Sequence, residues 1–409
     1  MTSAIFKSES IVPTNMKISN VVVWDGSNEI GPSTITWEGD EIRDVQPSGS
    51  AADLSLIPGL IDTHVHLVHY AGQKYVDYMT WPLVTSKYEQ VIHGVAQAAK
   101  ALKVGVTTLR DLAADELQIA IKRSLDSEII IGPRVFVNCI VGMTAGHGDL
   151  FTPPVVKDRR PTADGVVECR KLVRHWARMG TDGIKITTSG GVLSTQDKNE
   201  WRNYTLEEIK TITDEAHALG MPVAAHCHTE SGIQAAIDGG VDSLEHATSI
   251  TREQAQQAKS KGMTVAPTLT ILNRIVSGSL PIPEENLAKA RALHKVRTER
   301  MRSALKDGPT VVLGTDSGGH IMPIGLQLDE IKAMTTELDL SPDEALKGAT
   351  SYAAKVLRQE SRLGRIKAGY CADFVVIKGK PWKDISSLKP ENIVGVVCRG
   401  RLVHGRLPE

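Results

Sequence analysis

The sequence predicts an α/β fold, namely a (β/α)8 TIM barrel flanked by a small β-sandwich. From about residue 55 to residue 316, short runs rich in β-branched residues alternate with longer helical patterns, and eight such runs can be counted. This alternation is typical of βαβ units and a parallel sheet. An open doubly wound sheet shows the same alternation, but no glycine-rich phosphate loop opens the first helix. The closed barrel is therefore favoured.

The segments between the expected barrel strands have the periodicity of amphipathic helices. They include residues 88–105, 206–220 and 252–262, and the last two end in glycine, as helices commonly do. Two further helices are expected over 326–338 and 341–357, the second with Ser341 as its N-cap. The eight strands are expected within residues 56–66, 107–112, 134–140, 183–188, 222–228, 242–247, 264–270 and 311–317.

The two chain ends differ from the middle of the sequence. Both carry short apolar strands interrupted by Gly and Asp, and we expect these strands to pair with each other. Neither end should be stable alone. The expected domains are a β-sandwich from residues 1–56 and 362–409 and a (β/α)8 barrel over 57–361. The terminal strands are expected within residues 17–26, 33–45, 372–379, 392–400 and 401–406.

Composition excludes several classes of function. The 47 basic and 48 acidic residues give a net charge of −1, which offers no basic field for nucleic acid. No stretch approaches the roughly 18 apolar residues of a membrane helix, and the N-terminus shows no secretion signal. The five cysteines are scattered, odd in number and without CxxC spacing. These features favour a soluble protein in the reducing cytoplasm, acting on a small molecule and possibly assembled as a homo-oligomer.

Polar side chains that can bind metal follow the apolar runs. Catalytic residues of such barrels lie at the C-terminal ends of the strands. Imidazole nitrogens and carboxylates are the ligands that zinc and similar cations prefer. We therefore predict one site for two divalent metal ions, with Zn2+ favoured. The predicted ligands are His64, His66, Lys185, His226, His246 and Asp316.

Each kind of ligand also has an ordinary structural explanation. His64 and His66 share one strand face and can point together into the barrel, but a strand-end histidine is often only hydrogen-bonded. Lys185 could snorkel or form an ion pair, whereas reaction of its amine with carbon dioxide would give an anionic carbamate that bridges two cations. Asp316 could cap the following helix, bind metal, or act as a general base.

Three further side chains are candidates for contact with a substrate. His228 shares a strand face with His226, and we place it near the substrate as a donor to an anionic or carbonyl oxygen. His147 lies in a Gly-rich turn, where it either meets a ligand or bonds to a neighbouring carbonyl. Tyr204 follows residues 189–194, which resemble a binding loop.

Several segments, in a characteristic order, link the chain to known enzymes. They are LIPGLIDTHVHL, GIKITTSGGVLS, AAHCHTESGIQAAIDGGVDSLEHAT, LGTDSG and GRIKAGYCADFVVIKGKP. With them the chain resembles the amidohydrolase superfamily over nearly its whole length. Within it, the likeness is to the imidazolonepropionase-related group of Xaa-Pro dipeptidase-like enzymes, metal-dependent carboxypeptidases and ochratoxinase-like amidases. The turn at residues 318–323 departs from the group's usual Gly-Pro-His-Gly type, so the resemblance does not define the substrate.

The resemblance implies a binuclear centre and a hydrolytic mechanism. A bridging hydroxide activated by the two cations would attack the scissile carbonyl, and Asp316 would pass the proton to the departing amine. His228, and less directly His147 and Tyr204, would orient the substrate or stabilise the oxyanion. All six ligand positions are filled, which argues against a non-catalytic relative. The implied ligands are His64, His66 and Asp316 for one cation, His226 and His246 for the other, and N6-carboxylated Lys185 between them.

The expected activity is hydrolysis of an amide bond in a dipeptide or N-acyl amino acid, of the amidase or carboxypeptidase type. The alternative is hydrolysis of a cyclic amide, carbamate or urea, which needs the same metals but no pocket for a free α-carboxylate. A basic residue or a nest of backbone N–H groups near the metals would favour the first. A metal-free interaction protein of the same fold is the alternative from another class.

Overall fold

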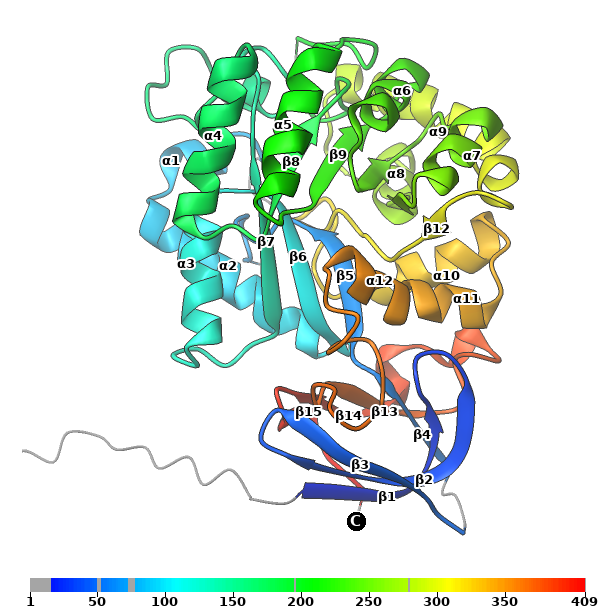
Figure 1. Cartoon of the computed structure of the whole chain (residues 1–409). Helices are drawn as coiled ribbons and strands as arrows, with labels where there is room; N and C mark the ends of the chain where they lie inside the picture. Colours follow the sequence, from blue (N-terminus) through cyan, green and yellow to red (C-terminus); the bar gives the residue numbers. More distant parts are fainter. Residues whose placement is uncertain (1–15, 50–52, 73–77, 195, 279, 409) are drawn as a thin grey trace, which may run out of the picture.

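The computed structural model describes residues 16–408, apart from residues 50–52, 73–77, 195 and 279. Two sheets organise these residues: an eight-stranded sheet from the middle of the chain and a seven-stranded sheet from its two ends. Figure 1 shows helices around the first sheet and the second sheet beneath it. The predicted fold class, a (β/α)8 barrel with a β-domain built from both ends, is confirmed.

The eight-stranded sheet is parallel and its last strand returns to its first. The strands follow one another in chain order. Thr63 N donates to Leu313 O (2.9 Å) and Asp316 N donates to His64 O (2.8 Å), which joins the two edges. All eight expected strands are present: β5 (Leu60–Val65), β6 (Val106–Ala114), β7 (Arg134–Ile140), β8 (Gly183–Thr187), β9 (Val223–Cys227), β10 (Ser243–His246), β11 (Thr264–Ala266) and β12 (Thr310–Val311).

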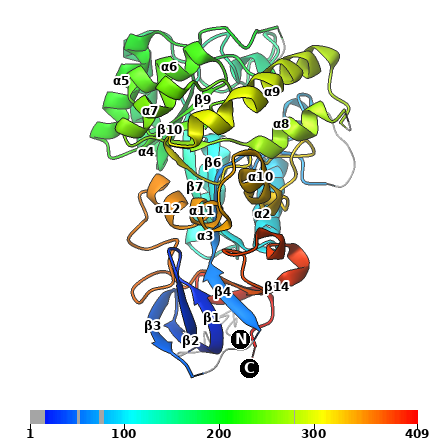
Figure 2. The same ribbon diagram turned by 90° about the vertical axis from the view of Figure 1, so that its right-hand side faces the viewer.

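Helices cover the outside of the barrel (Figures 1 and 2). Ser86, Thr205 and Thr251 begin three of them with capping boxes, which satisfy backbone N–H groups of the first turn. No helix in the described part of the chain is long and apolar enough to cross a membrane. The helices are α1 (Trp81–Val84), α2 (Lys87–Leu102), α3 (Glu116–Asp126), α4 (Val166–Met179), α5 (Leu206–Ala218), α6 (Glu230–Gly239), α7 (Arg252–Ser260), α8 (Leu269–Val276), α9 (Glu284–Leu305), α10 (Gln327–Glu337), α11 (Pro342–Gly348) and α12 (Ser351–Val356), with 3-10 turns at Asp149–Phe151, Ile385–Ser387 and Pro390–Asn392.

The last helix expected from the sequence is in fact two. It begins after Ser341, whose side chain caps the first turn as predicted, but it breaks between α11 and α12. The carbonyls of Gly348 and Ala349 accept hydrogen bonds from Leu313 N (2.9 Å) and Ile61 N (2.8 Å) of the barrel. A continuous helix would use these carbonyls for its own next turn. The expectation of one helix was therefore wrong, because contacts with the barrel compete with helix continuation.

The two chain ends form one mixed sheet. Strand β4 lies between β1, to which it is parallel, and β13, to which it is antiparallel, so the expected pairing of the ends is confirmed. Trp37 and Phe374 meet edge to face in its core, with ring centroids 5.0 Å apart. Arg134 Nε on β7 lies 2.6 Å from Asp373 Oδ2 and ties the barrel to this sheet. Its strands are β1 (Met16–Trp24), β2 (Glu29–Glu38), β3 (Glu41–Pro47), β4 (Leu54–Pro58), β13 (Phe374–Lys378), β14 (Ile393–Cys398) and β15 (Arg401–Gly405).

Candidate metal centre

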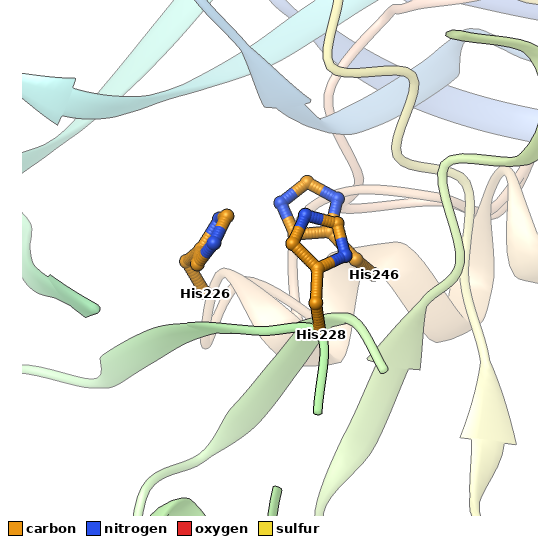
Figure 3. A group of neighbouring side chains, drawn as sticks. All are labelled: His226, His228 and His246. Atoms are coloured by element: carbon orange, nitrogen blue, oxygen red, sulfur yellow. The ribbon is translucent and has the colours of Figure 1, made fainter. Parts of the chain in front are cut away.

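The carboxyl ends of the barrel strands bring the predicted ligands together at one mouth, as expected for parallel strands. Two groups of three side chains have potential ligand atoms within 4.8 Å of one another. Figure 3 shows the second group, in which the rings of His228 and His246 stack with centroids 4.5 Å apart. The first group is His64, His66 and Asp316, and the second is His226, His228 and His246.

The two groups are neighbours. The ring centroids of His64 and His246 lie 5.1 Å apart. Within the first group, Asp316 Oδ1 lies 2.9 Å from His66 Nε2 and 3.3 Å from His64 Nε2. Although Asp316 is this close, His64 Nε2 is buried and makes no hydrogen bond of acceptable geometry with any described residue. A buried nitrogen of this kind is costly unless something binds it, and a cation between the carboxylate and the two rings would.

Two of the predicted ligands have a strained backbone. His246 has a φ of 68° and Asp316 a φ of 57°, in the left-handed region that residues other than glycine rarely adopt. Such conformations cost roughly 1–3 kcal/mol each and persist where the surrounding structure holds them, often at functional sites. Both strained residues are predicted metal ligands, which supports a functional role for this end of the barrel.

One nitrogen of each of four rings is held by a neighbouring oxygen. A histidine that binds metal usually donates its other ring N–H to such an oxygen, which sets the tautomer and the ring orientation. The remaining nitrogen then presents a lone pair. The contacts are His64 Nδ1 to Glu245 Oε2 (2.8 Å), His246 Nδ1 to Thr268 Oγ1 (2.7 Å), His228 Nδ1 to Thr248 Oγ1 (2.8 Å) and His226 Nε2 to Gly190 O (3.2 Å).

Lys185, on β8, lies close to both groups. Burial, with a smaller contribution from the charge of Lys185, lowers the pKa of His66 in one group and of His226 in the other. The pKa of His64 is raised instead, because Asp316 and Glu245 outweigh burial and Lys185. The Lys185 side chain is 3% exposed and Nζ has no hydrogen-bond partner. Burial lowers the pKa of Lys185 to about 8, against the opposing effect of Glu245. The predicted snorkelling or simple ion pair therefore does not describe this amine.

Sequence reasoning missed a buried ion pair beside His64. Glu245, on β10, accepts hydrogen bonds from Arg110 Nη2 (2.8 Å) and Ser243 Oγ (2.6 Å) through one oxygen, and its other oxygen meets His64. Burial alone would raise the pKa of Glu245, but Arg110 and His64 outweigh burial and hold it well below its usual range. The sequence did contain a signal for this ion pair: Arg110 lies within the apolar strand β6, and Glu245 lies within the apolar strand β10.

The same fold occurs in solved structures of known proteins. Residues 55–403 match the model of the amidohydrolase family. This chain belongs to the amidohydrolase family. The family is generally metal-dependent, in agreement with the two groups of histidine and aspartate side chains described above.

Individual proteins are similar to this chain in sequence or in structure over most of their length. Ochratoxinase of Aspergillus niger is 32% identical over 373 residues, covering 86% of this chain and 76% of that protein. Imidazolonepropionase of Deinococcus radiodurans is 25% identical over 364 residues, covering 84% and 82%. The crystal structure of a Xaa-Pro dipeptidase with methionine bound in the active site matches with a TM-score of 0.85 at 29% identity, covering 95% of this chain and 99% of that one. The resemblance inferred from the motifs is confirmed, and these relatives support a hydrolase.

His147, one of the three substrate-contact candidates, stands beside the amidohydrolase centre. Its ring stacks on that of His226, with centroids 4.3 Å apart. Its Nδ1 lies 2.9 Å from the hydroxyl of Ser194, which donates to Asp197 Oδ2 (2.7 Å). His228 belongs to the second donor group, so both histidines adjoin the predicted metals. Their contact with a substrate stays a prediction.

Tyr204, the third candidate, lies elsewhere. Its side chain is 1% exposed and its hydroxyl donates to Val141 O (2.8 Å) in the packed interior. This hydrogen bond accounts for the hydroxyl without a substrate. A role for Tyr204 in substrate binding stays a prediction that its surroundings do not favour.

We expect Tyr204→Phe to lower the free energy of unfolding by about 1–3 kcal/mol, because the buried carbonyl of Val141 loses its donor. Its kcat/KM should stay within about twofold of the unmodified enzyme. Urea denaturation and steady-state kinetics measure the two quantities. Tyr88→Phe, at a tyrosine that is 84% exposed, is the control and should change neither. A large loss of activity at unchanged stability would place the Tyr204 hydroxyl at the substrate.

Proposed function

We propose that this amidohydrolase uses two divalent metal ions to hydrolyse the amide bond of a dipeptide or an N-acyl amino acid. The observation that carries the proposal is the pair of donor groups near Lys185, whose buried amine has no hydrogen-bond partner among the described residues. Ochratoxinase and the Xaa-Pro dipeptidase, by their names, support an amide bond to an amino acid as the target.

The residues present fit a pair of zinc-like cations. His64, His66 and Asp316 would hold one cation, and His226 and His246 the other. An N6-carboxylated Lys185 would bridge them, since a carbamate supplies the anionic oxygens that the amine lacks. When bound, the cations supply Lewis acidity, which lowers the pKa of a shared water and polarises a carbonyl.

The side chains of the protein have separate tasks in this proposal. Asp316 accepts the proton of the attacking water at a carboxylate oxygen and delivers it to the amine that leaves. In this proposal the Thr248 hydroxyl donates to His228 Nδ1, which places the ring proton on Nε2, where it can donate to the substrate carbonyl oxygen. His147, stacked on His226, borders the same space. A small-molecule substrate, a cytoplasmic location and a homo-oligomer remain predictions.

The experiment that tests the proposal is metal analysis together with a substrate panel. We expect purified protein to bind close to two divalent ions per chain and to hydrolyse N-acyl amino acids or dipeptides. His64→Ala should lose metal and activity, whereas His175→Ala, at an exposed histidine on α4, should keep both. The panel includes carbamates and hydantoins, whose preferred turnover would favour the other substrate class. Protein without metal and without turnover on every substrate would contradict the proposal.

A further inference from the structure

A cavity of about 320 Å³ lies beside the candidate metal centre. This is the lower end of the roughly 300–1,000 Å³ of typical ligand pockets. None of the described residues that line it carries a carboxylate, an ammonium or a guanidinium group. The cavity is largely aromatic and aliphatic, with walls that include Tyr70, Tyr78, Trp81, Leu193, Leu280 and Ile321.

One wall of the cavity continues from the first donor group. Gly319 lines the cavity three residues after Asp316, which places the two Cα atoms within about 11 Å of each other. His69, another lining residue, has its Nδ1 3.3 Å from the backbone oxygen of His66. The ring of His69 stacks on that of Tyr78, with centroids 4.7 Å apart. An aromatic wall therefore starts at the ligand His66.

Another lining residue of the cavity is connected to the second donor group. Leu193 lines the cavity three residues after Gly190, whose carbonyl contacts His226 Nε2. Asn286 Nδ2 donates to the carbonyls of Val192 (2.6 Å) and, more weakly, of Ser194, so helix α9 holds Leu193 in place. The Asn286 amide nitrogen is thereby occupied. A substrate group in this cavity would therefore lie next to a scissile bond that is bound at the two donor groups.

We propose that this cavity, called here the aromatic pocket, binds one uncharged aromatic or bulky aliphatic group attached to the scissile amide. The inference rests on the proposed function and names its substrate class: N-acyl amino acids or dipeptides with a large apolar group on the acyl or the amine side. Burial of such a group in an apolar site is favourable, and the pocket has no charged side chain to compensate a charged one.

The test compares four substrates: N-acetyl-phenylalanine, N-benzoyl-glycine, N-acetyl-glycine and N-acetyl-glutamate. We expect kcat/KM for at least one aromatic substrate to exceed that for N-acetyl-glycine and N-acetyl-glutamate by at least about tenfold. The two aromatic substrates distinguish the amine side from the acyl side. Equal turnover of all four would overturn the pocket while the proposed hydrolase stands.

A variant that fills the pocket gives the second measurement. Leu280→Trp should abolish most of the aromatic preference, measured as the ratio of kcat/KM for the aromatic substrate to kcat/KM for N-acetyl-glycine. Leu193→Trp serves the same purpose if the first variant unfolds at a lower temperature. Leu402→Trp, on β15 and 44% exposed, is the matched control and should keep the preference. An unchanged preference in both pocket variants would overturn the proposal.

Binding measured without turnover separates the two proposals. Asp316→Asn is expected to be inactive, and calorimetric titration with N-benzoyl-glycine and N-acetyl-phenylalanine then reports the pocket directly. Binding that Leu280→Trp removes would support the pocket even if no substrate is hydrolysed by the unmodified protein. Absence of binding by both aromatic compounds would overturn the pocket, whatever the metal content.

Discussion

Lys185→Ala is expected to lose bound metal and hydrolytic activity together. The amine is close enough to both donor groups to affect their pKa values and has no hydrogen-bond partner among the described residues, and the proposed carbamate would contribute a ligand to each cation. Removing a group that merely orients a metal ligand costs about 10–100-fold in affinity or activity. Loss of a ligand that both cations share should lower metal affinity or activity by more than about 100-fold. Metal content per chain and kcat/KM on the best panel substrate measure the effect.

Chemical rescue makes this prediction specific. The truncated side chain leaves room for a small carboxylate, so acetate or propionate should restore part of the metal content and of the activity. Lys210→Ala, at an exposed lysine on α5, is the control and should behave like the unmodified enzyme. A Lys185→Ala protein that keeps both its metal and its activity would disprove the two-metal arrangement, even though the barrel is correct.

Glu245→Gln is expected to cost about 3–5 kcal/mol of unfolding free energy, because it leaves the buried guanidinium of Arg110 without its counter-charge. Arg110 is 1% exposed and Glu245 is fully buried, so water cannot replace the lost partner. The same carboxylate orients His64, and metal affinity should fall with stability. Urea denaturation measures the unfolding free energy. A chelator is present so that bound metal does not contribute to the measured stability.

A matched surface variant shows whether burial is the cause. Glu38 pairs with Arg43 at 3.3 Å, with side chains 48% and 49% exposed. Glu38→Gln should change the unfolding free energy by less than about 1 kcal/mol. If the two variants lose the same amount of stability, the pair of Arg110 and Glu245 does not contribute through its burial.

The candidate ligands could be predicted because they depend on local rules. Two residues apart on a strand share a face, and the ends of parallel strands meet at one edge, so His64, His66 and Asp316 converge once the barrel is inferred. The position of Lys185 within β8, between two isoleucines that face the other way, followed from the same alternation. Glu245 was visible in the sequence too, but its partner Arg110 is 135 residues away and is chosen only by the closure of the barrel.

The remaining differences between the sequence predictions and the structure come from contacts between residues that are far apart in the chain. The helix after Ser341 is interrupted because barrel strands take the carbonyls of Gly348 and Ala349, which no local periodicity reveals. Tyr204 follows a Gly-rich stretch, and its direction depends on a hydrogen bond to Val141, a residue beyond β7. The aromatic pocket likewise joins parts of the chain as distant as Tyr70 and Ile321.

The pairing of β4 with β13 has a consequence for biosynthesis. Leu54–Pro58 leaves the ribosome roughly 300 residues ahead of Phe374–Lys378. At roughly 5–20 residues per second, one edge of β4 waits on the order of tens of seconds for its partner. An open strand edge is a template for pairing with other chains. The nascent chain is thus most exposed to association with its neighbours on the polysome after its barrel has begun to form and before its last strands emerge.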